Sequence, residues 1–538
     1  MIRPQLRLKR VEWLLAILLS ALTILTLAVR ATQAGALWRD ECAVVQLAGM
    51  PSVSDVLGNF QHEAFPPLFP LIVRIYTVVF GSSDTALRIF GFCVGCLVIG
   101  AFWVNSRLFR PDVPLVALAL TSLNTTFFVW GTTIRGYGLG SAMIVLIFGC
   151  LGSLLLAEKR QRFITVALIC LFGVQILLYN GVLLIAVATS AIAILLVQSR
   201  SKQAFVVFTI CVVAMLSLLP YVPAYLQARD WNILVRGWPT SYSLWKHFEV
   251  ALGNPGYSIP WLWYGIAVGL IGVFVFRLYK NRSAESEQRQ LIWFTLVVCG
   301  LSAAGCYAFL RLLSYTTSVW YYLAFSCVIA AALDLIASIL CTTDWLRLFR
   351  LALAGAALIA APFADSSAIT ERQTNVDIAA QTVTAQVSAN DLVLVVPWQF
   401  GIAFHRYYRG AAPWMTIPNI TDHQVHRYDL MKLKMLSAHP IDDLTEAVRA
   451  TLSSGNRVWF VGGLNLPRPD EGPMVLPPAP ASRFKWDNRA YTDAWWQQLS
   501  VFAAVHANKV DPIPLPQPKS VRINELEETS LLVVEGWH

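Results

Sequence analysis

Charged residues are scarce in this 538-residue sequence: Asp, Glu, Lys and Arg together make up 14% of it. Soluble globular proteins carry about 25% charged residues, and this chain is 56% hydrophobic. So little charge excludes a disordered chain, a coiled coil and a soluble globular protein of this length. We therefore expect a multi-span membrane protein with an appended soluble part. The net charge of +9 is explained by Lys and Arg in cytoplasmic loops, and we expect no binding of nucleic acid.

Cysteine is absent after residue 364, so the last third of the chain cannot depend on disulfides. Most of the ten cysteines fall inside apolar runs, where Cys behaves as a small hydrophobic residue. Cys93 and Cys96 have the spacing of a metal or redox pair, but no His or further Cys accompanies them. We interpret them as packing residues.

Apolar runs long enough to cross about 30 Å of hydrocarbon recur along the first two-thirds of the chain. The run at 11–29 follows a basic N-terminus and exceeds the usual length of a signal-peptide core, which indicates an uncleaved first span. About eleven transmembrane helices are predicted, because lipid offers no partner for an unpaired backbone group. The predicted spans are 11–29, 86–107, 114–130, 138–157, 163–179, 181–197, 204–222, 261–277, 291–309, 319–340 and 348–364.

Basic residues lie in every second short loop, which is the positive-inside pattern of a chain with a cytoplasmic N-terminus. An odd number of spans then places the C-terminal region outside the cytoplasm. We predict a transmembrane domain over 1–364, whose first extracytoplasmic loop covers 31–85, and an extracytoplasmic domain over 365–538. The basic residues are Arg107, Arg110, Lys159, Arg160, Arg162, Arg200, Lys202, Arg277, Lys280, Arg282, Arg289, Arg347 and Arg350.

The tail after residue 364 has no spanning run and is richer in Pro, Asp and Gln. Short apolar segments at 391–397, 457–461 and 530–534 read as buried strands bounded by turn residues. A helical pattern at 441–452 lies between two of them. The tail is therefore predicted to be a small α/β domain.

Ionisable residues beside the membrane on the outer side are the candidate functional groups. Arg39, Asp40 and Glu41 follow the first span, and a carboxylate there can accept a proton from a hydroxyl. His62 and Glu63 precede Pro66 and Pro67 on an extended approach to an apolar stretch. Arg135, between two spans, needs an anionic partner: Asp40, Glu63 or a lipid phosphate. Arg88 is interpreted as a residue that snorkels from its helix end.

These motifs, in this order, resemble the bacterial members of the GT-C superfamily of integral-membrane glycosyltransferases. The likeness is to the protein-mannosyltransferase-like group, which includes the lipid A aminoarabinose transferases, and it runs from Trp38 to about Phe148. It rests on three elements: the acidic pair after the first span, a Pro-Pro-Leu run with downstream Phe-Gly and Ala-Leu-Arg, and an Arg-x-Tyr turn. In this sequence they are Asp40-Glu41, Pro66-Pro67-Leu68, Phe80-Gly81, Ala86-Leu87-Arg88 and Arg135-Gly136-Tyr137.

The resemblance implies an inverting glycosyltransferase that uses a polyprenyl-phosphate sugar on the outer face of a bacterial cytoplasmic membrane. Asp40 would be the base that deprotonates the acceptor, and Glu41 and Glu63 would orient acceptor or donor. Arg135 would hold the donor phosphate, with Tyr137 beside it, and Arg39, His62 and Arg311 are further candidates for substrate binding. The sequence departs from the family where many relatives have a Lys before the Pro-Pro pair and an Arg-Tyr pair at a late span. Here the residues are Ala64-Phe65 and Trp320-Tyr321-Tyr322, so Arg311 or Arg39 is expected to supply the cation.

No cluster of His, Asp or Glu has metal-ligand spacing, so no metal or other cofactor is expected, although Glu41 and Glu63 remain an alternative divalent-ion pair. The predicted partners are the lipid-linked donor, membrane lipids and a glycan, lipid or protein acceptor. A flippase for a lipid-linked saccharide and a non-catalytic envelope assembly protein are the alternatives. Transporters place charge at the membrane midplane, where this sequence has only Asp334.

Overall fold

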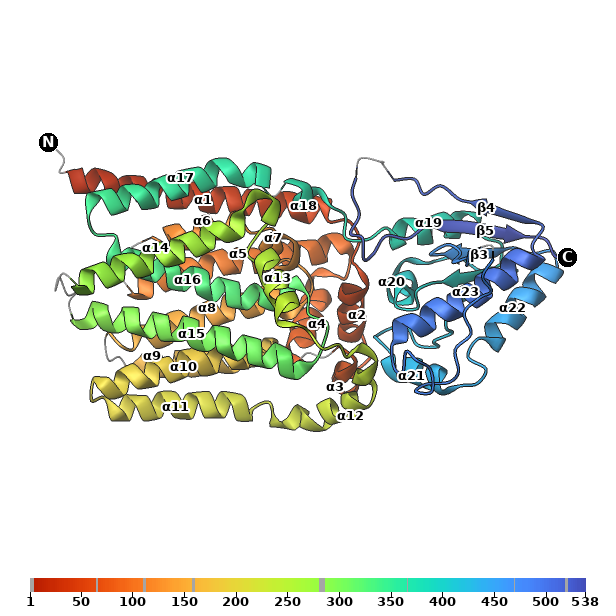
Figure 1. Ribbon diagram of the computed structural model, residues 1–538, viewed down its shortest axis with the longest axis horizontal. Helices are drawn as coiled ribbons and strands as arrows, with labels where there is room; N and C mark the ends of the chain where they lie inside the picture. The colour runs from red at the N-terminus through yellow and green to blue at the C-terminus, as the bar shows by residue number, and fades with distance from the viewer. Residues whose placement is uncertain are drawn as a thin grey trace.

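The computed structural model describes residues 4–63, 66–109, 113–156, 160–279, 286–364, 366–468, 470–517 and 521–538. A bundle of long helices carries a smaller α/β domain at one of its ends (Figure 1). Helix α1 (Pro4–Gln33) begins at the end of the bundle that lies opposite this domain (Figure 1). Ala64, Phe65, Arg110, Lys159, Lys280 and Arg282, which entered the sequence predictions, are outside the described residues.

Nine helices in the described part of the chain are long and apolar enough to cross a membrane. The chain is therefore a multi-span helical membrane protein, as predicted from its composition. They are α1 (Pro4–Gln33), α5 (Asp84–Phe109), α8 (Gly136–Ser153), α10 (Asn180–Val197), the helical segment Ser201–Val235 that begins with α11 (Ser201–Leu216), α14 (Ile259–Tyr279), α15 (Ser286–Leu313), the helical segment Val319–Leu340 that ends with α16 (Leu323–Leu340), and α17 (Asp344–Ala364).

Two of the eleven predicted spans differ in the structure. The predicted span 163–179 is α9 (Arg160–Ile176), whose 17 residues make it one of the shorter apolar helices. The predicted span 114–130 is wrong as a single helix, because it breaks into α6 (Leu115–Thr121) and α7 (Thr125–Trp130). At 1.5 Å per residue, each piece is roughly 10 Å long and too short to cross the membrane alone.

Two polar side chains account for this break. The Asn124 side chain accepts a hydrogen bond from the Phe127 amide at 3.0 Å and so caps the start of α7. The Asp334 carboxylate on α16 accepts from the Val116 amide at 2.8 Å and the Ala117 amide at 3.4 Å, at the start of α6. The buried charge of Asp334 thus satisfies the free amides of a helix N-terminus within the bundle.

Glycine allows α5 and α8 to pack closely beside the turn at 131–135. A Cβ on Gly91 of α5 would lie 2.0 Å from the Thr132 carbonyl oxygen. A Cβ on Gly138 of α8 would lie 1.9 Å from the Gly131 carbonyl oxygen. Small residues at these two positions therefore fix the turn that ends at Arg135.

The predicted first loop contains four helical segments near the end of the bundle. They are α2 (Arg39–Ala48), α3 (Val53–Asn59), the short 3-10 helix η1 (Phe60–His62) and α4 (Leu68–Phe80). Between α11 and α14 lie η2 (Leu219–Tyr221), α12 (Val222–Asn232), η3 (Ile233–Val235), α13 (Ser241–Ala251) and η4 (Pro255–Tyr257), and η5 (Val319–Tyr322) precedes α16.

The C-terminal domain contains a five-stranded sheet in the order β2-β1-β3-β5-β4. Strands β1 (Leu392–Val395), β2 (Trp414–Thr416) and β3 (Val458–Val461) are parallel, while β5 (Leu531–Glu535) runs antiparallel to β3 and to β4 (Lys509–Pro512). Leu394 pairs with Phe460, which pairs with Leu532. Every residue of β1 and β3 is buried, as expected for strands covered on both faces. The helices are α18 (Ser366–Thr370), α19 (Val376–Gln386), α20 (Phe400–Tyr407), α21 (Tyr428–Leu436), α22 (Asp442–Ser453) and α23 (Asn488–His506).

Polar contacts join α20 to the end of the bundle. Arg406 pairs with Asp84 at 2.7 Å, and the Tyr407 hydroxyl donates to the other Asp84 oxygen at 2.8 Å. The same hydroxyl accepts a hydrogen bond from the Leu37 amide at 2.8 Å. These contacts tie the C-terminal domain to the segment that enters α2, where the acidic pair lies.

Candidate functional site

The start of α2 separates the two acidic residues that the sequence places side by side. Trp38 precedes the helix, and its amide donates to the Glu41 carboxylate at 3.3 Å, which turns Glu41 back toward the bundle. The Trp38 ring is buried against Trp130 and Trp320, with ring centroids 5.3 and 5.8 Å apart. Asp40 points the other way, and 21% of its side chain is exposed. Both acids favour a helix N-terminus, where the partial charge is positive.

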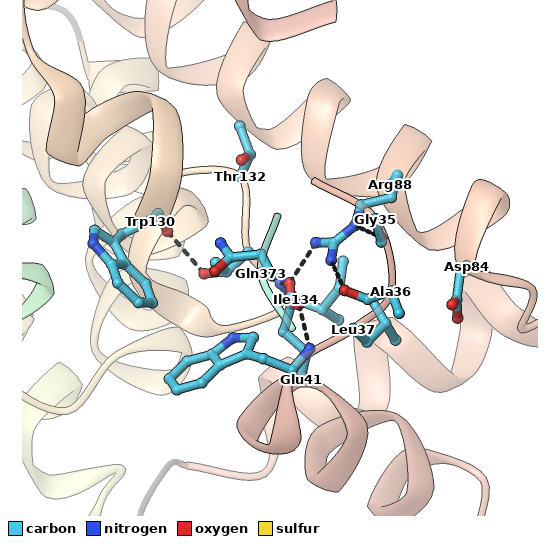
Figure 2. A network of polar contacts seen from close by, with 12 residues as sticks. Gly35, Ala36, Leu37, Glu41, Asp84, Arg88, Trp130, Thr132, Ile134 and Gln373 are labelled. Atoms are coloured by element: carbon cyan, nitrogen blue, oxygen red, sulfur yellow. Dashed lines mark hydrogen bonds and ion pairs between the residues drawn. The ribbon is translucent and has the colours of Figure 1, made fainter. Parts of the chain in front are cut away.

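Glu41 belongs to a buried ion pair with Arg88 of α5, as Figure 2 shows. One Glu41 oxygen lies 2.9 Å from the Arg88 guanidinium and also accepts from the Ile134 amide at 2.9 Å. Arg88 further donates to the Gly35 and Ala36 carbonyl oxygens at 3.1 and 2.6 Å. The Glu41 side chain thus forms a buried ion pair and does not lie with the side chain of Asp40. Arg88 does not snorkel, because its guanidinium is buried and bound on three sides.

Asp40, Glu63 and Arg135 lie together, although they come from three separate segments. Glu63 directly follows η1, and one of its oxygens lies 2.8 Å from the Arg135 guanidinium. Arg135 precedes α8, and its second terminal nitrogen lies 4.0 Å from the Asp40 carboxylate. Arg135 also donates to the Asp40 carbonyl oxygen at 3.2 Å. One guanidinium therefore joins the two acidic side chains.

The C-terminal domain adds two residues to this group that the sequence did not indicate. His426 lies between the two carboxylates: its Nδ1 is 3.0 Å from Glu63, and its Nε2 is 3.5 Å from Asp40. Glu527 lies 3.2 Å from the Nε of Arg39, which in turn is 3.6 Å from Asp40. No local motif marks either residue, because each is brought to Asp40 only by the docking of the tail. We call Arg39, Asp40, Glu63, Arg135, His426 and Glu527 the Asp40 cluster.

Asp40 is the accessible carboxylate of the Asp40 cluster. The side chain of Glu63 is 1% exposed and that of Glu527 is fully buried, against 21% for Asp40. Three cationic groups, on Arg39, Arg135 and His426, lie within 4.0 Å of the Asp40 carboxylate. The Asp40 carboxylate is therefore partly exposed and surrounded by three cationic groups.

Burial and neighbouring charges shift the pKa values of three groups in the cluster. Burial opposes the ionisation of Glu63, but His426 and Arg135 outweigh it and lower the pKa of Glu63 to about 2. Burial disfavours a charged His426, yet the Glu63 and Asp40 carboxylates raise the pKa of this imidazole. Complete burial raises the pKa of Glu527 to about 7, with Asp40 adding to the effect and Arg39 opposing it. The contacts thus favour an imidazolium at His426 and a carboxylate at Glu63.

The remaining predicted site residues lie at the edge of the cluster or apart from it. The His62 ring stacks on Trp231 at 5.2 Å and lies 3.9 Å from Asp429, so it faces α12 and α21. Tyr137 is buried, with its ring 6.4 Å from those of Trp320 and Tyr321. Arg311, in the last turn of α15, donates to the carbonyl oxygen of Pro239. The polar contact of Arg311 is therefore with the 236–240 segment and not with the Asp40 cluster.

Aromatic residues occupy the late-span position where the sequence departs from the pattern of the family that it resembles. Trp320 packs on Trp130 with ring centroids 4.2 Å apart, and the Tyr322 hydroxyl donates to the Leu244 carbonyl oxygen at 3.0 Å. Among the described residues, no group of three or more His, Cys, Asp or Glu side chains is arranged to hold a metal ion. Arg39, Arg135 and His426 are the cations that the fold places around Asp40.

No protein-family model and no curated protein matches the chain. Among solved structures, the chain is similar to the crystal structure of ArnT from Cupriavidus metallidurans bound to undecaprenyl phosphate. The two are 12% identical, the match covers 84% of this chain and 92% of that chain, and the TM-score is 0.47.

Proposed function

We propose that this protein is an inverting glycosyltransferase that takes a sugar from a polyprenyl-phosphate donor on the outer face of a bacterial cytoplasmic membrane. The observation that supports this most directly is the accessible Asp40 carboxylate with Arg39, Arg135 and His426 around it. Sugar transfer needs a carboxylate near the attacking oxygen and positive charge near the departing group. The Asp40 cluster has both within one set of contacts.

In the proposed reaction, an acceptor hydroxyl attacks the anomeric carbon of the donor while its proton passes to the Asp40 carboxylate. The bond between the anomeric carbon and the phosphate oxygen breaks, and polyprenyl phosphate leaves with the electron pair. Attack on the face opposite the phosphate inverts the anomeric configuration. Because the leaving group is already an anion, guanidinium and imidazolium groups can balance its charge without a metal.

The division of roles follows from exposure. Glu63 is buried between Arg135 and His426, so we assign it the task of holding these two cations in place. Arg39, 3.6 Å from Asp40, has about a quarter of its side chain exposed, at 24%. Arg39 is therefore the cation most open to the donor phosphate, with Arg135 and His426 beside it.

The location of the cluster also supports a lipid-linked donor. The start of α2 lies at the end of the helical bundle, between the bundle and the C-terminal domain (Figure 1). A polyprenyl chain lies in the bilayer and would bring its phosphate to the membrane surface at this end of the bundle. A water-soluble nucleotide sugar does not need a site at the membrane surface. With a cytoplasmic N-terminus, this end of the bundle faces outward.

Donor binding and turnover test the proposal separately. The protein in nanodiscs would be mixed with a panel of polyprenyl-phosphate sugars, and thermal stabilisation would identify the donor. We expect Asp40→Asn to retain stabilisation by that donor and to lose sugar transfer, because the base is gone while the cations remain. His426→Gln should weaken donor binding, and Arg311→Ala should leave it unchanged, because Arg311 contacts Pro239 instead.

Two outcomes would contradict the proposal. If no polyprenyl-phosphate sugar stabilises the protein, the donor assignment is wrong. If Asp40→Asn leaves all activity intact, the protein is better explained as a flippase or an assembly protein, neither of which needs a base at this position.

A further inference from the structure

A groove of about 470 Å³ lies outside the Asp40 cluster, between α12–η3 and the C-terminal domain. This volume falls within the range of about 300–1,000 Å³ that is usual for small-molecule sites. The bundle side contributes Leu226, Arg229, Asp230, Ile233 and Arg236, and the domain side contributes Lys432 and Trp486.

Positive charge dominates the groove. Arg229, Arg236 and Lys432 face a single acidic residue, Asp230. Within the described part of the chain, neither Arg229 nor Arg236 has a carboxylate partner, and neither guanidinium donates a hydrogen bond. The arginines that join the two domains elsewhere are different: Arg39 pairs with Glu527, and Arg406 pairs with Asp84. The guanidiniums of the groove are thus available to an outside anion.

Lys432 and Trp486 form the opposite wall. The Lys432 ammonium donates to the Asp230 carbonyl oxygen at 2.5 Å, which fixes it across the groove, and it lies 5.4 Å from the centre of the Trp486 ring. An ammonium has three donors, so two remain for a ligand. The Trp486 ring is partly buried against the core of the domain, so a ligand that binds Lys432 would also lie against the rim of this ring.

Packed aromatic residues link the groove to the Asp40 cluster on both walls. Lys432 lies one helical turn after Tyr428, whose ring stacks on His426 with centroids 6.1 Å apart. On the other wall, Asp230 adjoins Trp231, which stacks on His62, the neighbour of Glu63. The groove and the Asp40 cluster therefore share the residues that support them.

We propose that this groove binds a phosphate-bearing saccharide and is the acceptor site of the protein. Arg229, Arg236 and Lys432 would bind the phosphate group, and Trp486 would contact a sugar ring. Planar guanidiniums match the oxygens of phosphate, which is why phosphate is favoured over a neutral glycan. The role as acceptor site rests on the proposed transferase function, whereas the binding of a sugar phosphate does not.

The binding test uses glucose 1-phosphate as the probe with the full-length protein in phosphatidylcholine nanodiscs, followed by isothermal titration. Arg236→Ala and Lys432→Ala should each weaken binding about tenfold, because each removes a charged hydrogen bond to the phosphate. Arg449→Ala, which removes an exposed arginine on α22, is the matched control and should bind as the unmodified protein does. Binding should also weaken with added salt.

Trp486→Ala separates the sugar contact from the phosphate contact. We expect it to weaken the binding of glucose 1-phosphate while leaving the binding of inorganic phosphate unchanged. If Arg135→Ala weakens the binding of glucose 1-phosphate while Arg236→Ala and Lys432→Ala do not, the probe binds in the Asp40 cluster and the inference is wrong. If nanodiscs of phosphatidylcholine and phosphatidylglycerol in equal parts abolish probe binding, the groove takes a lipid headgroup and the saccharide assignment is overturned.

The two proposals fail in different ways. If glucose 1-phosphate binding depends on Arg236 and Lys432 but the protein transfers no sugar, the groove is a binding site and the transferase proposal is refuted. Sugar transfer whose rate and acceptor KM are unchanged in Arg236→Ala and Lys432→Ala would retain the transferase and refute the groove as its acceptor site.

Discussion

The buried pair of Glu41 and Arg88 allows a sharp test of whether an acid in this region is structural. In Arg88→Met, the Glu41 carboxylate keeps only the Ile134 and Trp38 amides as partners, and the Gly35 and Ala36 carbonyls lose their donor. Leaving one charge of a buried pair without its partner costs about 3–5 kcal/mol. We expect the free energy of unfolding to fall by that amount.

The double variant Glu41→Gln with Arg88→Met removes both charges. It should be less destabilised than the sum of the single variants by about 1–3 kcal/mol, because no charge is then left uncompensated. Arg449→Met removes the exposed partner of Glu446, 2.7 Å away on α22, and should change stability by less than about 1 kcal/mol.

Reversible unfolding of the purified protein in bicelles would measure these differences, and sugar transfer per folded molecule would be measured alongside. Glu41→Gln should keep its turnover, in contrast to Asp40→Asn. The reasoning fails if Arg88→Met lowers the free energy of unfolding by no more than Arg449→Met does. It also fails if Glu41→Gln is stable and inactive, since Glu41 would then take part in the chemistry.

Three further changes follow from the described contacts. Glu527→Gln should flatten the pH dependence of the melting temperature. In the folded protein the pKa of Glu527 is about 7, above the ordinary value of 4.5, so the unmodified protein loses stability as pH rises between these values. An unchanged slope of melting temperature against pH in the variant would contradict this. Gly138→Ala should disrupt the turn before Arg135 and weaken donor binding. Gly269→Ala is the control and should leave donor binding unchanged, because a Cβ there meets no atom within 4 Å. Equal donor binding by the two variants would refute the close packing. Asp334→Ala should lower the free energy of unfolding by about 1–2 kcal/mol through loss of the α6 cap, measured by unfolding in bicelles, and a neutral effect would exclude capping.

Composition and hydropathy were enough to predict the membrane-spanning bundle and the central strands of the tail. The predicted strands 391–397, 457–461 and 530–534 correspond to β1, β3 and β5, and the predicted helix 441–452 to α22. The short strands β2 and β4 were missed, because β4 has exposed residues and β2 has only three, so neither carries a buried apolar run.

The break between α6 and α7 shows a limit of hydropathy. The run 114–130 contains no charged residue, but Asn124 and the distant Asp334 stabilise two helix starts in it. A window of hydropathy registers neither cap, because one is a single residue and the other lies 218 positions away from Val116.

The candidate site was only partly accessible from the sequence. The motifs led to Asp40, Glu63 and Arg135, which the fold brings together, although their roles stay a prediction. They named Asp40 as the base but also gave Glu41 a place at the substrate, because its buried pairing with Arg88 depends on the start of α2 and cannot be read from local sequence. His426 and Glu527 were missed because nothing local distinguishes a buried titratable residue in a tail from a solvated one.

Glu527 lies 488 positions after Arg39, and β5 follows it. Their contact therefore joins the segment that opens α2 to a segment that is synthesised long afterwards. A chain in which only the helical bundle has been made holds Asp40 without His426 and Glu527 as neighbours. The Asp40 cluster is therefore complete only once the C-terminal domain has folded and docked on the end of the bundle.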